Sequence, residues 1–250
     1  MNLFESIITS ISYIKNPIKR KWLRFDFLFK NKKGLEIGGP SAFFQLKSPL
    51  PIYAWAKHID GVNFSNNTLW EGALQEGELY QYSKNKKGFQ FIYEATSLTG
   101  IPNSSYDFII SCHSLEHTAN PIKALMEWKR VLGDKGSLAL ILPDKNYTFD
   151  FIRPITTIEH LIEDYKNHTS EMDETHFEEV ITLSDLTIGN SSITNEEFIQ
   201  RTYQNYENRA VHHHVFDLKL VKAMLEYVGF KLLYQEAYSN LHLVAVAQKI

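Results

Sequence analysis

The chain has 250 residues, of which 44% are hydrophobic and 22% are charged. This length is enough to bury a full core, and it fits one domain with an insertion better than two domains. Its formal net charge of −3 gives no case for nucleic acid as a partner, which usually requires a basic domain or stripe. Cys112 is the single cysteine, so an internal disulfide is excluded. No apolar run is long enough to span a bilayer, and no signal-peptide pattern opens the chain. We therefore expect a soluble, cytoplasmic protein.

Residues 1–33 are expected to form a helical lead-in. Ile7, Ile8, Ile11 and Ile14 repeat at helical spacing before Asn16-Pro17 interrupts the pattern. Eight Lys or Arg and a single acid lie between positions 15 and 33. This cluster favours a solvated basic helix packed beside the core. The alternative is a surface that approaches a phosphate-bearing substrate or an anionic membrane.

The first strand and turn are expected at Gly34-Leu35-Glu36-Ile37-Gly38-Gly39-Pro40-Ser41, a short apolar run that ends in two glycines. After it, apolar runs alternate with helical patterns, which predicts an α/β sheet. In such sheets the turn after the first strand lies at the ligand crevice, where glycines let the backbone approach a ligand. Glu36 strengthens this interpretation, because a buried strand should otherwise be apolar.

The run Leu35-Glu36-Ile37-Gly38-Gly39 resembles the first motif of class I S-adenosylmethionine-dependent methyltransferases, with a type 11-like pattern. The resemblance implies S-adenosylmethionine as the cofactor, with Glu36, Gly38 and Gly39 near its methionine end. Pro40 departs from the family, which usually has another glycine there. The stretch also lacks the G-x-G-x-x-G spacing of a dinucleotide fingerprint.

The second strand is expected at residues 58–64. In the resembling family an acidic residue at the end of this strand accepts hydrogen bonds from the cofactor ribose. Here that position is Asn63, with Asp60 as the alternative. An amide also pairs with hydroxyls, since it offers two donors and an acceptor. Residues 66–88 have few apolar anchors and are expected to form a helix and a loop.

The third strand is expected at residues 89–93, followed by Glu94 and Ala95, which the resemblance places at the edge and face of the adenine. The fourth strand, residues 106–111, leads into a Ser-x-His-x-Leu-Glu-His run that also resembles the family. In this run His113 is expected to face the methionine end of the cofactor. His117 is expected to pack or cap locally.

The next elements carry clear boundary signals. Asn120 and Pro121 predict the start of a helix, with Asn as the cap and Pro in the first turn, and Gly133 predicts its end. Residues 136–142 are nearly all apolar, as a strand buried on both faces requires. They predict the fifth strand, which Pro143 closes.

Residues 145–211 no longer fit a plain α/β core. They are predicted to form an insertion over the carboxyl ends of the strands, where such enzymes hold their substrates. The core resumes with a helix that Asp217 caps and Gly229 ends. Two strands, 230–234 and 241–247, are then expected to pair as an antiparallel edge.

Histidine is the expected proton acceptor. Methyl transfer from a sulfonium is an in-line displacement that needs alignment and exclusion of water, and an oxygen acceptor also needs a base. Imidazole has a reference pKa of about 6.5, so a neutral ring is available near pH 7. One of His212, His213 and His214, which follow the insertion, is expected to be this base. A hydrogen-bonded polar loop is an equally good interpretation of the triplet.

Asp144, Asp150, Arg153 and His160 follow the fifth strand and are expected to bind substrate, Arg153 through bidentate bonds to a phosphate. The alternative is an ion-paired cap on the insertion. A metal site that joins two histidines of the triplet to one of these residues lacks any compact ligand motif such as H-E-x-x-H. No metal is therefore expected.

These features predict an α/β fold, a doubly wound, mostly parallel Rossmann-like sheet with an antiparallel last strand and an inserted cap. Residues 34–250 are expected to form the methyltransferase domain. The expected function is S-adenosylmethionine-dependent O-methylation of a sugar, nucleotide-sugar or other small hydroxylated substrate, a carbohydrate modification. The expected partner is thus a small molecule or glycan rather than nucleic acid. The alternative is a non-catalytic protein of the same fold that binds S-adenosylmethionine or a nucleotide.

Overall fold

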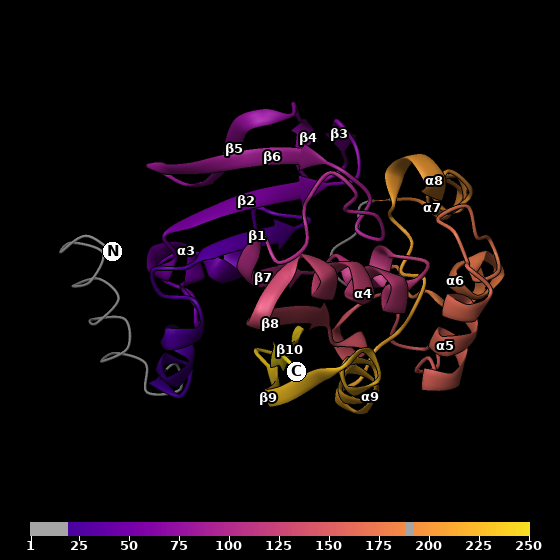
Figure 1. Ribbon diagram of the computed structural model, residues 1–250. Coiled ribbons are helices and arrows are strands. Elements are labelled where there is room, and N and C mark those ends of the chain that lie inside the picture. Colours follow the sequence, from indigo (N-terminus) through magenta and orange to yellow (C-terminus); the bar gives the residue numbers. More distant parts are fainter. Residues whose placement is uncertain (1–19, 189–192) are drawn as a thin grey trace.

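The computed structural model describes residues 20–188 and 193–250 (Figure 1). The isoleucine repeat of the expected N-terminal helix, the Asn16-Pro17 break and residues 189–192 of the predicted insertion lie outside the described residues. The described chain opens with a 3₁₀ helix, η1, Leu23–Leu28, which buries Phe25 and Leu28.

Strands and helices make up most of the described chain. The strands are β1 Lys33–Ile37, β2 His58–Asn63, β3 Asn67–Thr68, β4 Gly72–Ala73, β5 Gly77–Ser83, β6 Lys86–Ile92, β7 Tyr106–Cys112, β8 Leu132–Pro143, β9 Phe230–Tyr238 and β10 His242–Lys249. The α-helices are α3 Ile52–Trp55, α4 Pro121–Val131, α5 Ile158–Lys166, α6 Phe177–Leu183, α7 Asn195–Tyr203, α8 Asn205–Asn208 and α9 Leu218–Val228. Further 3₁₀ helices are η2 Ala42–Phe44, η3 Leu115–His117 and η4 Lys145–Tyr147.

In the described part of the chain, eight strands form one sheet in the order β5-β6-β2-β1-β7-β8-β10-β9. Five neighbouring strands of this sheet, β6, β2, β1, β7 and β8, run parallel. Strand β10 pairs antiparallel with both β8 and β9. This arrangement confirms the predicted mostly parallel, Rossmann-like sheet with an antiparallel end. The other edge is antiparallel as well, because β5 and β6 form a hairpin.

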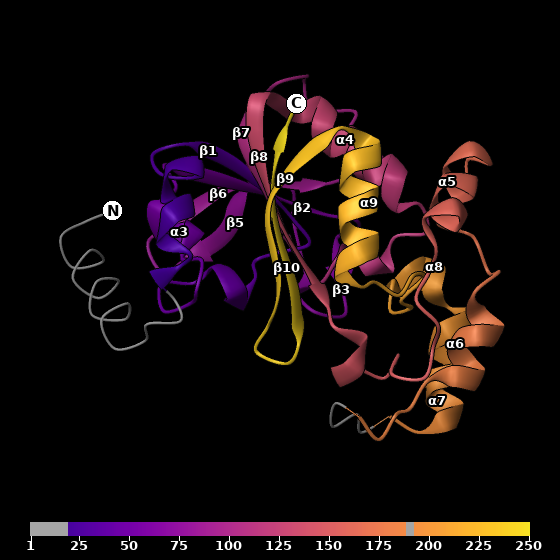
Figure 2. The same ribbon diagram turned by 90° about the horizontal axis from the view of Figure 1, so that it is seen from below.

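The central strands are buried on both faces, and alternate side chains feed two separate cores. In β8, Leu138, Leu140 and Leu142 pack with α4 and α9. Ala139 and Ile141 of the same strand face an aromatic layer contributed by η1, η2 and α3. Figure 2 shows α3 on one side of the sheet and α4 and α9 on the other. Because successive side chains point to opposite faces, such a strand must be apolar at nearly every position.

The helix boundaries follow the capping signals of the sequence. The Asn120 side chain accepts a hydrogen bond from the Lys123 amide of α4 at 3.0 Å. Asp217 accepts one from the Leu220 amide of α9 at 2.7 Å. Gly229 ends α9 with a φ of +87°, a conformation that glycine adopts without steric cost. The predicted start of α4 and the predicted ends of α9 are confirmed.

The expectation of a helix and a loop over residues 66–88 is wrong. This stretch forms β3, β4, β5 and the first residues of β6. Within β5, Tyr80 and Tyr82 are buried while Leu79 and Gln81 are exposed, so the side chains alternate with the period of a strand. Two buried aromatic rings at alternate positions outweigh the low apolar content that suggested a helix.

The segment 145–211 joins β8 to α9 and contains η4 and the helices α5, α6, α7 and α8. In Figure 1 these helices lie beyond the carboxyl ends of β1, β2 and β6. The segment also has a small apolar core of its own, formed by Phe177, Val180, Phe198 and Val211. No helix within residues 20–188 or 193–250 combines the length and the apolarity that a membrane crossing requires.

Candidate active site

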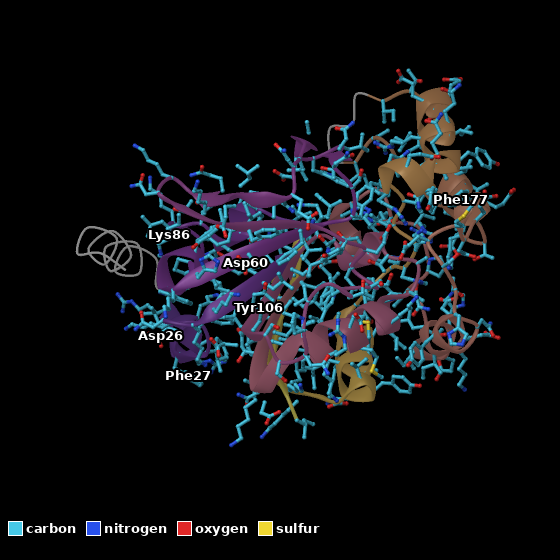
Figure 3. The ribbon with its side chains drawn as sticks, turned by 45° about the horizontal axis from the view of Figure 1, so that its top comes forward. Asp26, Phe27, Asp60, Lys86, Tyr106 and Phe177 are labelled. Atoms are coloured by element: carbon cyan, nitrogen blue, oxygen red, sulfur yellow. The ribbon has the colours of Figure 1, made fainter. Side chains whose placement is uncertain are left out.

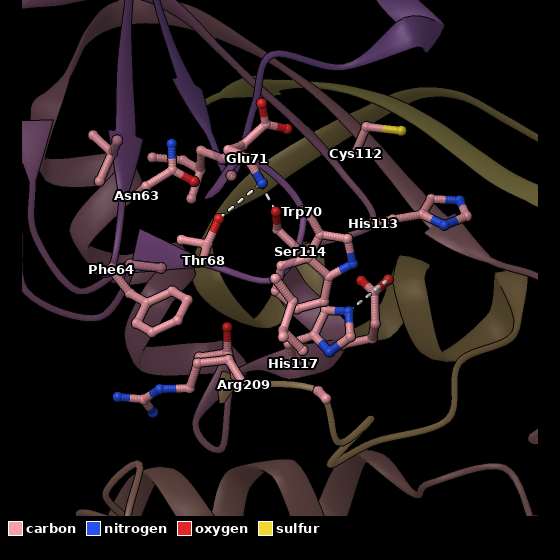
Figure 4. Close-up of a pocket in the computed structure, with 18 of the residues that line it drawn as sticks. Asn63, Phe64, Thr68, Trp70, Glu71, Cys112, His113, Ser114, His117 and Arg209 are labelled. Atoms are coloured by element: carbon pink, nitrogen blue, oxygen red, sulfur yellow. Dashed lines mark hydrogen bonds and ion pairs between the residues drawn. The ribbon is translucent and has the colours of Figure 1, made fainter. Parts of the chain in front are cut away.

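A cavity of about 750 Å³ opens at the carboxyl ends of β1, β2, β6 and β7 (Figure 4). Its size is that of a small-molecule or cofactor site, which usually measures about 300–1,000 Å³. The predicted site residues that line it are Gly38, Asn63, Glu94, Ala95, His113 and His212. Among the described residues, the predicted ones outside its lining are Glu36, Gly39, Asp60, Asp144, Asp150, Arg153, His160, His213 and His214.

The turn after β1 brings the backbone to the cavity wall. Gly38 has a φ of +77°, and a Cβ built on it would lie 1.8 Å from Ser114 Oγ. Ser114 cannot easily move away, because its hydroxyl donates to the Ile37 carbonyl at 3.1 Å. Both the conformation and the space therefore require glycine at this position.

Glu36 supports the turn from behind the cavity wall. Its fully buried carboxylate accepts hydrogen bonds from Tyr53 at 2.7 Å, from Tyr80 at 2.6 Å and from the Ser41 hydroxyl at 2.7 Å. Burial raises the pKa of Glu36 to about 7 despite these bonds. Ser41 itself lines the cavity, so Glu36 positions the wall rather than facing the ligand.

At the end of β2, Asn63 and not Asp60 reaches the cavity. The Asn63 amide donates to the Gly39 carbonyl at 3.1 Å, which ties the second strand to the glycine turn. Asp60 points elsewhere. Its carboxylate accepts from the Tyr106 hydroxyl and the Phe89 amide, both at 2.8 Å, and Figure 3 shows Asp60 and Tyr106 together within the sheet.

Glu94 and Ala95, which follow β6, also line the cavity. Arg209 donates to Glu94 at 2.6 Å and to Glu171 at 2.8 Å, and its guanidinium lies 5.2 Å from the Phe64 ring centroid. Arg209 thus joins the segment 145–211 to the strand ends. The sequence offers no signal for the role of Arg209 beyond a charged side chain just before the histidine triplet.

Two polar side chains that follow β7, His113 and Glu116, line the cavity. His113 adopts a φ of +52°, and burial lowers its pKa to about 3, which keeps the ring neutral. Its Nε2 lies 2.9 Å from His242 Nδ1. Glu116 is fully buried, and burial raises its pKa to about 7. Neither Glu116 oxygen has a hydrogen-bond partner among the described residues.

The histidine triplet separates into three environments. His212 lines the cavity, and its Nδ1 is hydrogen bonded to Asp150. Burial disfavours the charged ring, but the charge and hydrogen bond of Asp150 outweigh it and raise the pKa of His212. His213 is bonded to Asn205, and His214 donates to the Ala119 carbonyl at 3.1 Å. Only His212 of the three is placed to meet a ligand in the described cavity.

The four residues expected to bind substrate lie behind this wall or away from it. Arg153 is buried and donates to Asp150 at 2.7 Å, to Glu179 at 2.8 Å and to the His212 carbonyl at 2.7 Å. Asp144 accepts a bond from the Asn146 amide at the start of η4. His160 contacts His176 on the far side of the triplet. Arg153 and Asp150 therefore hold the His212 backbone and ring in place.

Residues 50–140 match the family model described as a methyltransferase domain. A solved S-adenosylmethionine-dependent methyltransferase from Mesorhizobium loti is 12% identical, with a TM-score of 0.51 over 93% of this chain and 96% of that one. A protein of Pyrococcus horikoshii is 15% identical, with a TM-score of 0.50 over 95% and 91%. No curated protein sequence matches the chain.

The sheet order is thus that of a Rossmann-like fold, and residues 50–140 match a methyltransferase domain. In its fold the whole chain is similar to a solved S-adenosylmethionine-dependent methyltransferase.

The cavity has features that fit S-adenosylmethionine. Glu116 presents a buried carboxylate without a partner in the described chain, and a buried carboxylate requires a cation or a donor. The sulfonium and ammonium groups of S-adenosylmethionine supply such cations. Asn63 and Ala95 line the same cavity, Asn63 with an amide that can pair with hydroxyls and Ala95 with a small apolar side chain. When bound, the cofactor supplies an electrophilic methyl group.

Proposed function

We propose that the enzyme methylates an oxygen of a sugar, a nucleotide-sugar or another small hydroxylated substrate. The observation that carries this proposal is the pair formed by His212 and Asp150 at the cavity wall. A hydroxyl acceptor must lose a proton as the new C–O bond forms. An imidazole whose other nitrogen is held by a carboxylate is well suited to accept it.

Two neighbours complete this arrangement. One ligand-type atom from each of Glu116, His117 and His212 lies within 4.8 Å of the others. His117 Nδ1 donates to the Val211 carbonyl at 3.1 Å, and burial lowers its pKa, so the ring stays neutral. The nearby charge of Glu116 adds to that of Asp150 in raising the pKa of His212, which favours acceptance of the proton.

The mouth of the cavity supports a sugar as the acceptor. Trp70 is 55% exposed and its ring lies 5.0 Å from His117, while Phe149 lies 4.5 Å from the His212 ring. Aromatic surfaces beside a few placed polar groups are typical of small-molecule sites. These rings offer flat faces to the apolar face of a sugar.

Arg201 supports a phosphate-bearing substrate such as a nucleotide-sugar. It lines the cavity, and burial lowers its pKa. No carboxylate pairs with it among the described residues. A guanidinium binds a phosphate through two parallel hydrogen bonds. The net charge of −3 also favours a small molecule over nucleic acid, and the single cysteine supports a cytoplasmic location.

The test is His212→Ala, measured by transfer of a labelled methyl group to a panel of sugars and nucleotide-sugars. We expect turnover to fall by about 10²–10⁴-fold, the usual contribution of a general base. Calorimetry should show that S-adenosylmethionine affinity changes by less than about threefold. The control is His168→Ala, which removes an exposed histidine outside the cavity and should leave turnover unchanged.

Asp150→Asn provides a second readout. Loss of the carboxylate charge lowers the pKa of His212, so the rise of kcat with pH should move to lower pH as the rate falls. Full turnover in His212→Ala would reject the base. Methylation of non-sugar acceptors alone would reject the substrate class but leave the methyltransferase intact.

A further inference from the structure

Three histidines and an aspartate converge outside the lining of the proposed cofactor cavity. His160 and Asp164 are one turn apart on α5, His176 directly precedes α6, and His214 follows the base in the triplet. Each offers one ligand-type atom, and these atoms all lie within 4.8 Å of one another. None of the four is among the described residues that line the cavity.

The spacing of these atoms is that of a tetrahedral metal site. His160 Nε2 lies 3.1 Å from His176 Nε2 and 3.4 Å from Asp164 Oδ2, and Asp164 Oδ2 lies 3.6 Å from His214 Nε2. Ligands at zinc distances of about 2.0–2.1 Å in a tetrahedron are separated by about 3.3 Å. We propose that these four residues bind a divalent transition-metal ion, with Zn²⁺ as the best match to three imidazoles and one carboxylate.

The aspartate is oriented for this role. Thr169 donates to Asp164 Oδ1 at 3.2 Å, which fixes the carboxylate and leaves Oδ2 toward the histidines. Oδ2 is buried and has no hydrogen-bond partner in the described chain. A buried carboxylate oxygen without a partner is costly, and a cation removes that cost. A hydrogen bond to the second oxygen is also how proteins orient carboxylate ligands.

The histidine rings present nitrogen atoms to one another and to Asp164. Nδ1 of His214 is buried without a partner in the described chain, while its Nε2 lies 3.1 Å from the Ala119 carbonyl. Metal binding through Nε2 moves the ring proton to Nδ1 and replaces the bond to Ala119. The His160 side chain is 39% exposed, which gives the ion a path to the site.

The inferred role is structural. Four protein ligands close a tetrahedral zinc site, so no position is left for substrate or water. The ion would link α5 and the start of α6 to the loop that contains His212–His214 and so carries the proposed base. The site does not depend on the identity of the methyl acceptor.

The experiment uses the purified full chain, stripped with a chelator and titrated with Zn²⁺ by calorimetry, and in parallel with Co²⁺ by visible absorption. We expect one tightly bound Zn²⁺ per chain, a higher melting temperature in its presence, and the intense absorption of tetrahedral Co²⁺. His160→Ala and Asp164→Asn should each weaken Zn²⁺ binding by at least about tenfold, in line with loss of a ligand.

Two controls locate the site. His168→Ala removes an exposed histidine close to α5 and should bind Zn²⁺ as the wild type does. Glu116→Gln disables the other possible cluster, Glu116 with His117 and His212, and should also retain one Zn²⁺. Absence of Zn²⁺ binding, octahedral Co²⁺ in the wild type, or unchanged affinity in His160→Ala would each overturn the proposal. The first two outcomes are measured on the wild type, so they can refute the proposal even if a variant fails to fold.

Discussion

Replacing Gly38 with alanine tests how the cavity wall is built, and Gly72→Ala is its matched control. Both glycines have positive φ, +77° and +67°, so alanine is strained at each by about 1–2 kcal/mol. At Gly72 a Cβ meets nothing within 4 Å in the described structure, whereas at Gly38 it lies 1.8 Å from Ser114 Oγ. Only Gly38→Ala therefore combines backbone strain with a collision.

The collision adds two costs that can be estimated. Ser114 must give up its 3.1 Å bond to the Ile37 carbonyl, worth about 1 kcal/mol, and the crowded wall costs about 1–3 kcal/mol more. Gly38→Ala should thus lose about 3–6 kcal/mol of unfolding free energy, against about 1–2 for Gly72→Ala. Urea unfolding measures both values.

The same pair of variants separates stability from binding. Gly38 lines the cavity and Gly72 lies outside it among the described residues. Calorimetry should show S-adenosylmethionine binding weakened at least about tenfold in Gly38→Ala, equivalent to about 1.4 kcal/mol, and unchanged in Gly72→Ala. Equal losses of stability and of affinity in the two variants would refute the steric argument.

Three further variants test buried charge and capping. Burial raises the pKa of Glu116 from 4.5 to about 7, so its contribution to stability is present below pH 4.5 and is lost as pH rises to 7. The unfolding free energy of Glu116→Gln relative to that of the wild type should then rise by up to roughly 3 kcal/mol between pH 5 and pH 8, as measured by urea unfolding. A difference between the two proteins that does not change with pH would contradict this. Arg209→Leu removes the ion pair of Glu171 and leaves it the hydrogen bond from the Ala119 amide. It should lower the unfolding free energy by about 3–5 kcal/mol, and a loss below about 1 kcal/mol would contradict this. Asp217→Ala removes the cap of α9 and should lower the melting temperature by the equivalent of about 1 kcal/mol; an unchanged temperature would rule out the cap.

Much of the fold could be predicted because its signals are local. The apolar run of β8, the Asn120 and Asp217 caps and the Gly229 end each depend on a few neighbouring residues. The hairpin of β5 and β6 was missed because its stability comes from tertiary burial of Tyr80 and Tyr82, which local composition does not reveal. Tertiary contacts of this kind override weak propensities.

The site was predictable where residues directly follow strands. Asn63, Glu94 and His113 reach the cavity because parallel strands end at one edge of a sheet. The segment 145–211 has no such rule, so the pairing of Arg209 with Glu94, 115 positions away, could not be read from the sequence. Likewise, which histidine of the triplet faces the cavity depends on Asp150 and Arg153, whose orientation only the folded chain defines.

The central claim is that one cavity at the strand ends holds the cofactor beside His212. A crystal structure of the protein with S-adenosylhomocysteine tests it most directly. The account predicts the product's amino-acid end near Gly38 and Glu116, its ribose at Asn63, its adenine beside Ala95, and its sulfur turned toward His212. Density for the product anywhere else, or with the sulfur facing away from His212, would contradict the account.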